Sequence, residues 1–233
     1  MKNALILLAG GMGKRLKNRI PKQFVKIGNY NLIEYFLKNL NKDLFGSITI
    51  VVNIKNRKKY LSQLKKDYPF HNINFVNCGT TRQLSTKKGL IFLKKTNPKN
   101  VLIHDAVRPF VSDALIDIIV STVVDGQGCV PGLQVTDAIK SVDEGKIVRS
   151  IERSKIWHVQ TPQGFPFDQI LEAHRSLNGK NLVDDSAVAE AYGISVAVVP
   201  GLSDNEKITN KEDLKKAMQK DFLKPPDFRV GNG

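Results

Sequence analysis

Cysteine is scarce in this chain of 233 residues. Only Cys78 and Cys129 are present, far apart in the sequence and without the spacing that metal-binding cysteines share. This usage argues against a disulfide framework and a cysteine-based metal site, and it predicts a reduced, cytoplasmic protein. Histidine is also scarce, because the chain has only four, and they form no arrangement typical of catalysis.

Long apolar runs are missing as well. No run approaches the roughly 18 residues that a membrane span needs. The apolar residues 4–9 follow Lys2, but the run is shorter than the apolar core of about 7–15 residues in a signal peptide. A loop of glycines and basic residues follows it in place of a cleavage site. The run therefore predicts a buried first strand, and no membrane partner is expected.

Acidic residues are few relative to basic ones. The chain has 22 Asp and Glu against 36 Lys and Arg, a formal charge of +14. Such an excess attracts any polyanion, whether nucleic acid, phospholipid surface or phosphorylated metabolite. Much of it lies in the lysine-rich residues 55–66 and 87–99, which are typical of solvated helix faces. Nucleic-acid readers usually add interleaved aromatic residues or a recognisable module. Neither is present, so no nucleic-acid partner is expected.

What the sequence does contain is a regular alternation of short apolar runs with longer amphipathic stretches, the pattern of βα units. Strands are expected at residues 4–9, 48–52, 73–76, 101–104 and 129–133, and helices at 32–40, 58–66, 82–94 and 112–124. Ser112 is a suitable cap for the last helix. The alternation predicts an α/β fold with a mostly parallel, Rossmann-like sheet and helices on both faces. Ligands of such sheets collect at the carboxyl ends of strands.

The pattern changes between about residues 134 and 157. Residues 135–142 and 147–151 read as two strands, and the turn between them contains Gly145 at a suitable position. These residues predict a β-hairpin arm that leaves the α/β domain, as dimerisation or lid elements often do.

A glycine-rich, basic loop follows the first expected strand. Residues 9–15 read Ala-Gly-Gly-Met-Gly-Lys-Arg, and glycines allow backbone N–H groups to approach a phosphate closely. A dinucleotide fingerprint would need glycine at Leu16, and a P-loop would need glycine at Leu8 and Ser or Thr after Lys14. Taken alone, the loop fits a phosphate-binding loop and a plain turn about equally. A further cation stands nearby in Pro21-Lys22-Gln23.

Further motifs follow in order along the chain. They are Arg82 with Ser85, His104-Asp105-Ala106-Val107-Arg108-Pro109, Trp157-His158-Val159-Gln160-Thr161-Pro162-Gln163, Asp184-Asp185 and Asp204-Asn205-Glu206-Lys207-Ile208-Thr209. Together with the loop, this set closely resembles the 2-C-methyl-D-erythritol 4-phosphate cytidylyltransferases of the non-mevalonate isoprenoid pathway, and it spans nearly the whole chain to about Met218. Many sugar nucleotidyltransferases share the loop alone, whereas the combination is specific.

The resemblance implies transfer of CMP from CTP to 2-C-methyl-D-erythritol 4-phosphate, with release of pyrophosphate. The attacking phosphate monoester has a second pKa near ~6, so it is already anionic at neutral pH and no general base is needed. Repulsion between anions is the difficulty, and positioned cations with Mg²⁺ overcome it.

The resemblance also implies roles for individual residues. Arg15 and Lys22 would stabilise the transition state, and Arg153 and Lys207 would position the methylerythritol phosphate. The CTP-binding set comprises Ala9, Gly10, Gly11, Gly13, Gly79, Arg82, Ser85, Asp105 and Ala106. Asp105, Arg108, Arg153 and Lys207 would contact the second substrate, and Mg²⁺ would lie near the CTP phosphates with Asp105 as a candidate ligand. Considered one at a time, without the ordered set of motifs, Arg153 and Lys207 would be interpreted as solvated surface residues.

The family's hairpin swaps onto a neighbouring subunit, which implies a homodimer with a shared site. Two positions depart from the family, which commonly has threonine where Ala138 and Val183 stand. The sequence is therefore also compatible with a sister enzyme that uses CTP with another polyol phosphate, such as ribitol 5-phosphate. A second alternative is a non-catalytic basic module that binds nucleotides or nucleic acid.

The expected domain organisation has two parts. Residues 1–222 form the nucleotidyltransferase domain, with the hairpin arm at about 134–157. Residues 223–233 contain Lys224-Pro225-Pro226-Asp227 and read as a linker. The last seven residues resemble the opening strand of 2-C-methyl-D-erythritol 2,4-cyclodiphosphate synthase, which some bacteria fuse behind the cytidylyltransferase. The chain is accordingly expected to be the N-terminal part of a bifunctional protein.

Overall fold

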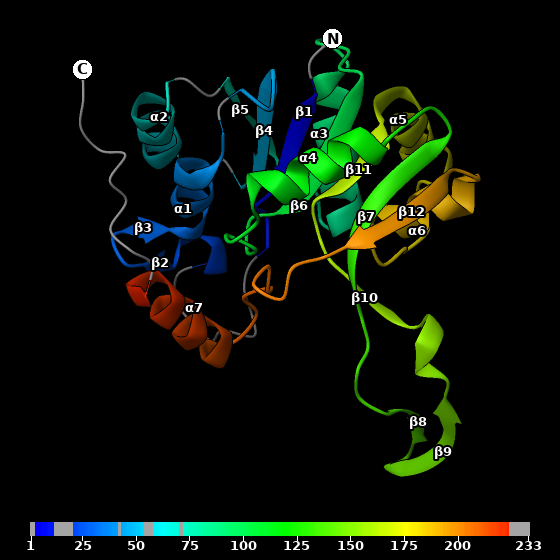
Figure 1. The fold of residues 1–233 in the computed structure, drawn as a ribbon. Coiled ribbons are helices and arrows are strands. Elements are labelled where there is room, and N and C mark those ends of the chain that lie inside the picture. Colours follow the sequence, from blue (N-terminus) through cyan, green and yellow to red (C-terminus); the bar gives the residue numbers. More distant parts are fainter. Residues whose placement is uncertain (1–2, 12–20, 42, 54–57, 70–71, 224–233) are drawn as a thin grey trace.

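The computed structural model describes residues 3–11, 21–41, 43–53, 58–69 and 72–223 (Figure 1). Its central sheet has eight strands in the order β10-β7-β11-β6-β1-β4-β5, and β12 pairs with β7. These strands are β1 (Ala4–Leu8), β4 (Ser47–Val52), β5 (Ile73–Asn77), β6 (Asn100–Asp105), β7 (Gln127–Gln134), β10 (Trp157–Val159), β11 (Gln163–Pro166) and β12 (Ser195–Pro200). All pairings are parallel except those that β10 and β11 make. The prediction of a mostly parallel sheet is confirmed.

Strand β1 shows why helices cover both faces of this sheet. Side chains alternate between the faces of a strand, and Leu5 and Leu7 pack into one buried cluster, whereas Ala4 and Ile6 pack into another. The first cluster includes side chains from α1 (Leu32–Asn39), α2 (Lys58–Asp67) and α4 (Asp113–Thr122). The second includes side chains from α3 (Arg82–Leu93), α5 (Phe167–Ser176) and α6 (Asp185–Tyr192). The predicted two-sided covering is therefore confirmed.

Local capping explains where two of these helices begin. Asn31 caps α1 and forms a reciprocal capping box with Glu34. The Ser112 side chain accepts a hydrogen bond from the backbone nitrogen of Leu115, as expected for the cap of α4. Both contacts satisfy backbone N–H groups that have no partner within the first turn of a helix.

A third packing unit lies where the first and last parts of the chain meet. The helix α7 (Lys211–Leu223) contributes Ala217 to a small buried cluster with Ile27, Leu32 and Val107. A short two-stranded sheet of β2 (Lys26–Ile27) and β3 (Tyr30–Asn31) lies beside it, preceded by the 3-10 helix η2 (Lys22–Phe24). Figure 1 shows α7 below β2 and α1.

The hairpin arm projects from the sheet (Figure 1). Its strands are β8 (Ile139–Asp143) and β9 (Lys146–Ile151), joined by a turn in which Glu144 and Gly145 have φ angles of 46° and 78°. The 3-10 helix η3 (Arg153–Lys155) follows. The prediction that residues 135–138 belong to the first strand is wrong. Val135 is buried at the base of the arm, where its nitrogen donates to the carbonyl oxygen of Ile156, and the hairpin pairing begins only at Ile139.

Among the described residues, no helix has both the length and the apolar character needed to cross a membrane.

Candidate active site

The site forms around the carboxyl ends of the parallel neighbours β1 and β6. Leu8, the last residue of β1, is in register with Asp105, the last residue of β6. The backbone nitrogen of Ala106 donates to the carbonyl oxygen of Leu8 at 3.1 Å. The chain therefore leaves β1 as Ala9, Gly10 and Gly11 directly beside Asp105, which is the edge where ligands of such sheets bind.

Gly10 lies so close to Cys78, the residue after β5, that a side chain cannot fit. A Cβ atom at this position would lie 2.6 Å from the Cβ atom of Cys78 and 3.2 Å from its sulfur. Gly79, one residue further along, is equally constrained, since its Cβ would lie 2.6 Å from that of Leu84. Both glycines are thus required by close approach of two chain segments.

Ser85 stabilises the turn after β5. Its hydroxyl accepts a hydrogen bond from the backbone nitrogen of Gly79 at 3.0 Å and donates to the carbonyl oxygen of Thr81 at 2.8 Å. The hydroxyl oxygen lies 3.8 Å from the Cβ position of Gly10. Gly10, Gly79 and Ser85, predicted separately as nucleotide-binding residues, therefore lie together.

A buried glutamine places Lys22 beside the same loop. The side-chain amide of Gln23 donates to the carbonyl oxygen of Ala9 at 2.6 Å, and Gln23 is 4% exposed. The Cβ position of Gly11 lies 3.7 Å from Cε of Lys22. The predicted Gly13 and Arg15 lie outside the described residues.

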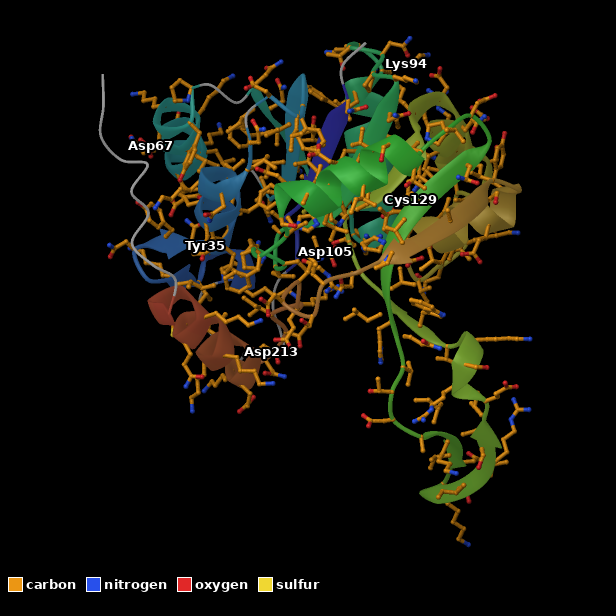
Figure 2. The ribbon with its side chains drawn as sticks, in the orientation of Figure 1. Tyr35, Asp67, Lys94, Asp105, Cys129 and Asp213 are labelled. Carbon is orange, nitrogen blue, oxygen red and sulfur yellow. The ribbon has the colours of Figure 1, made fainter. Side chains whose placement is uncertain are left out.

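Charged side chains extend from the surface into the core in a continuous line. Nζ of Lys207 lies 2.6 Å from Oδ2 of Asp105, and Nε of Arg82 lies 3.5 Å from Oδ1 of the same carboxylate. Nη1 of Arg82 lies 2.7 Å from Oδ2 of Asp185. Nε2 of His174 lies 3.2 Å from the other oxygen of Asp185. Figure 2 shows Asp105 below the ends of the central strands.

These contacts determine the charge state of the line. Burial on its own raises the pKa of Asp105, but the charges of Arg82 and Lys207 outweigh this and hold the pKa well below its usual range. Burial likewise opposes ionisation of Asp185, and Arg82 together with His174 lowers its pKa. Burial lowers the pKa of Arg82, yet the two carboxylates raise it overall. Asp105, Arg82 and Asp185 are therefore charged at neutral pH.

Two other arginines predicted for the site, Arg108 and Arg153, donate hydrogen bonds to backbone carbonyl oxygens of the protein. Nη1 of Arg108 donates to the carbonyl oxygen of Asn205 at 2.7 Å, and burial lowers the pKa of Arg108. Arg153 lies in the arm, where its guanidinium donates to the carbonyl oxygen of Thr136. Figure 1 shows the arm extending away from the end of β6. Within one chain, Lys207 therefore contacts Asp105, whereas Arg153 makes its hydrogen bond inside the arm.

Several buried polar residues of this region had no predicted role. Asp185, His174 and Asn205 have between 0% and 1% exposure. Asp185 and Asn205 stood in motifs that were identified, so their acidic and amide side chains were a usable signal. His174 follows Ile170 by one helical turn in α5, a spacing that reads as an ordinary core position.

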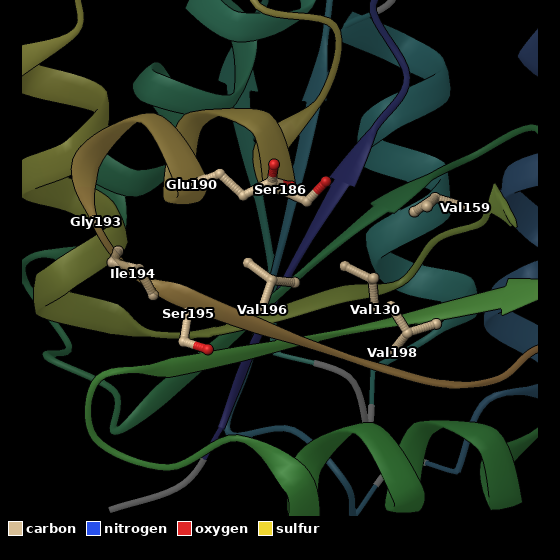
Figure 3. A pocket seen from close by; sticks show the side chains of 9 residues that line it. All are labelled: Val130, Val159, Ser186, Glu190, Gly193, Ile194, Ser195, Val196 and Val198. Atoms are coloured by element: carbon tan, nitrogen blue, oxygen red, sulfur yellow. The ribbon is translucent and has the colours of Figure 1, made fainter. Parts of the chain in front are cut away.

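A separate hollow lies between α6 and the strands β7, β10 and β12 (Figure 3). Its cavity volume is about 400 Å³, and Val130, Val159, Val196, Val198 and Glu190 are among the residues that line it. None of the predicted site residues lines this cavity. Its apolar lining suits it poorly to a triphosphate.

Comparisons with known proteins identify relatives of this chain. Curated relatives include the bifunctional enzyme IspD/IspF of Rhodospirillum rubrum, which is 36% identical over 234 residues, and that of Bartonella henselae, which is 37% identical over 242 residues. All of this chain is matched in both cases, but only 60% and 61% of the relatives. The chain thus spans about 60% of the length of these curated relatives.

Solved structures show the same fold. The 4-diphosphocytidyl-2C-methyl-D-erythritol synthase of Anaerococcus prevotii matches with a TM-score of 0.80 at 26% identity, covering 94% of this chain and 97% of its own. The bifunctional IspDF of Campylobacter jejuni matches with a TM-score of 0.77 at 29% identity, covering 93% of this chain and 54% of its own. Residues 3–220 also match the sequence family of these enzymes. The chain belongs to the 2-C-methyl-D-erythritol 4-phosphate cytidylyltransferase family.

Proposed function

We propose that this chain transfers CMP from CTP to 2-C-methyl-D-erythritol 4-phosphate and releases pyrophosphate, as a step of isoprenoid precursor synthesis. The observation that carries the proposal is the placement of Lys207 against Asp105 at the end of β6, next to the glycine loop. An ammonium and a carboxylate at a strand end suit the binding of phosphates and of a divalent cation. Family membership supplies the specific reaction.

The reaction needs positive charge more than acid–base chemistry. The acceptor phosphate is anionic at neutral pH because its second pKa is about 6. Backbone N–H groups of Gly10 and Gly11 would hold the triphosphate, and Lys22, beside Gly11, would neutralise charge at the α-phosphorus. Arg15 would act with it. Lys207 would orient the attacking phosphate while Asp105 keeps the ammonium in place.

Mg²⁺ is the expected metal, and Asp105 fits its requirements. Mg²⁺ usually takes one or two carboxylates and fills its other positions with phosphate oxygens and water. Among the ion pairs of the described residues, the one that involves Oδ1 of Asp105 is with Arg82 at 3.5 Å, which leaves this oxygen with capacity for a cation. The pKa of Asp105 lies below its usual range, so the carboxylate is ionised. When bound, the ion would neutralise charge on the CTP phosphates.

The arm supports a proposed homodimer, and the free Cys78 and Cys129 are consistent with the proposed cytoplasmic location. Its apolar side chains Val142, Ile147 and Val148 are 58%, 66% and 63% exposed, and exposed apolar clusters often mark interaction sites. A second chain that covers them would also bring its own Arg153 to this site. Sedimentation at micromolar concentration tests the proposal: a dimer is expected, and replacement of Ile147 and Val148 by serine should give monomers. A wild-type monomer would contradict it.

A pyrophosphate-release assay tests the function directly. The chain is incubated with CTP and Mg²⁺ and with methylerythritol phosphate, ribitol 5-phosphate or no acceptor. Release that depends on methylerythritol phosphate is expected. Release with ribitol 5-phosphate would favour the sister enzyme, and absence of release with salt-sensitive nucleic-acid binding would favour a binding module.

Two lysines close in sequence provide a matched comparison for the assay. Lys22→Ala should abolish turnover, as should Arg15→Ala, while the fold stays intact. Lys26→Ala, which removes an exposed lysine of β2, should leave turnover unchanged. Near-normal kcat in the Lys22 variant would remove the proposed role of this residue.

Residues 224–233 lie outside the described part of the chain. The linker and second domain expected there stay a prediction, which the reading frame of the gene tests.

A further inference from the structure

The hydroxyl of Thr161 contacts the end of β6, which carries Asp105 of the ion pair, and the backbone carbonyl of Thr161 contacts Asn205. Thr161 is 5% exposed and stands in the turn between β10 and β11. Its oxygen accepts a hydrogen bond from the backbone nitrogen of Asp105 at 3.1 Å. The same oxygen lies 3.0 Å from Nδ1 of His104, whose side chain is fully buried.

The partners of His104 fix where its proton lies. Nε2 of the ring lies 2.9 Å from the carbonyl oxygen of Arg108. A carbonyl oxygen can only accept, so Nε2 must carry hydrogen. A neutral ring has only one such proton, which leaves Nδ1 as an acceptor for the hydroxyl of Thr161. Hydrogen bonds therefore run in one direction, from the N–H of Asp105 to Thr161, on to His104 and then to the carbonyl of Arg108.

The backbone of the same turn is joined to the segment that carries Lys207. The side-chain amide of Asn205 donates to the carbonyl oxygen of Thr161 at 2.8 Å and to Oε1 of Gln160 at 3.3 Å. Gln160 is also hydrogen-bonded twice to the backbone of Leu202, at 2.8 Å and 3.2 Å. Asn205 is fully buried. The turn thus links the end of β6 to residues 202–205, immediately before Lys207.

We propose that Thr161 is a positioning residue that sets the geometry of Asp105 against Lys207, and that it does so through the Nε2–H tautomer of His104. The hydroxyl acts on the backbone of Asp105 rather than on a substrate. Its removal would leave the N–H of Asp105 and Nδ1 of His104 without partners in a buried place. The Asp105 carboxylate would then move relative to Lys207. The kinetic part of this inference rests on the proposed function, whereas the tautomer does not.

The tautomer is tested on the wild-type protein by ¹⁵N NMR of its histidine rings, with His104 assigned from the His104→Gln variant. Protonated Nε2 and unprotonated Nδ1 are expected at neutral pH. A ring protonated at Nδ1, or at both nitrogens, would overturn the proposal. This measurement requires no turnover, so it stands even if the chain proves inactive toward methylerythritol phosphate.

The positioning role is tested with Thr161→Val, which keeps the shape of the side chain and removes the hydroxyl. Small displacements of reacting groups cost up to about 100-fold in rate, and kcat per folded enzyme should fall by about 10- to 100-fold with little change in KM for CTP. Thr161→Ser, which restores the hydroxyl, should recover most of kcat.

Thr49→Val is the matched control. Thr49 is fully buried in β4, and its hydroxyl has no hydrogen-bond partner among the described residues. This variant should keep the wild-type kcat. A Thr161→Val enzyme with wild-type kcat would overturn the positioning role, as would an equal loss in Thr49→Val or no recovery in Thr161→Ser. A merely structural role would lower the folded fraction and leave kcat per folded enzyme unchanged.

Discussion

Nη1 of Arg82 lies 2.7 Å from Oδ2 of Asp185, although the side chain of Asp185 is only 1% exposed and that of Arg82 is 28% exposed. Arg82 is therefore anchored in the core at one end of its guanidinium. Its Nε faces the carboxylate of Asp105 at 3.5 Å. This arrangement explains how an arginine on the first turn of α3 is held at the end of β6, and it couples the stability of the core to the shape of the site.

Replacement of Asp185 by asparagine should destabilise the protein strongly. The change leaves Arg82 and His174 without the buried carboxylate that each contacts. Loss of one partner from a buried ion pair typically costs about 3–5 kcal/mol, and the urea midpoint of unfolding measures it. Asp117→Asn, on the exposed side of α4, is the control and should change stability by less than about 0.5 kcal/mol. Equal effects of the two substitutions would contradict the buried pairing.

The free energy of unfolding should also fall at acid pH, because the ionised form of Asp185 stabilises the folded protein. Its pKa is lowered in the folded protein, whereas the unfolded chain has the ordinary value of about 3.9. Below that pH the unfolded state binds more protons than the folded state, so the stabilisation present above about pH 4 is lost as the pH falls. Urea midpoints between about pH 5 and pH 3 should drop less steeply for Asp185→Asn than for the wild type. Parallel curves would count against this assignment.

Lys207→Ala should lower turnover with little loss of stability. The ammonium contacts Asp105 at 2.6 Å, yet the Lys207 side chain is 39% exposed. Removal of one charged group that stabilises a transition state typically costs about 10²–10³ in kcat. Pyrophosphate release measures the loss. Lys220→Ala removes a similarly exposed lysine that pairs with Asp204 at 2.8 Å, and its kcat should stay at the wild-type value.

Gly10→Ala should destabilise the protein before any ligand is added. The new Cβ would lie 2.6 Å from that of Cys78, so backbone must shift. Overpacking of this kind costs about 1–3 kcal/mol, which corresponds to roughly 2–12 °C in Tm for a chain of this size. Among the described residues, the Cβ of Gly11→Ala meets only Cε of Lys22 at 3.7 Å, and the Tm of this variant should change much less. A thermal melt of each ligand-free variant decides between these outcomes.

Local patterns were sufficient for much of the fold. Residues 4–9 read as a strand because the run is short and apolar, and β1 is confirmed there. Ser112 read as a cap because its hydroxyl can accept from the first turn, and α4 begins after it. Such features depend on neighbours in sequence, and physical rules for them are local.

Strand β11 could not be predicted from local patterns. Gln163-Gly-Phe-Pro166 contains glycine and proline and has no clear period. It is inserted antiparallel between β6 and β7 because those strands offer open backbone partners there. The polar residues near it behave similarly. Thr161 and Asn205 were identified as parts of motifs, but their contacts with each other depend on the folded chain.

Alternation, spacing and motif order are properties of the chain, and they were enough to identify an α/β member of the cytidylyltransferase family with a glycine-rich loop. The contacts of Lys207 with Asp105 and of Arg82 with Asp185 became known from the folded chain. Each pair joins residues about a hundred positions apart, and charges interact strongly only over a few ångströms. Those distances follow from the packing of the strands and helices, which no local pattern specifies.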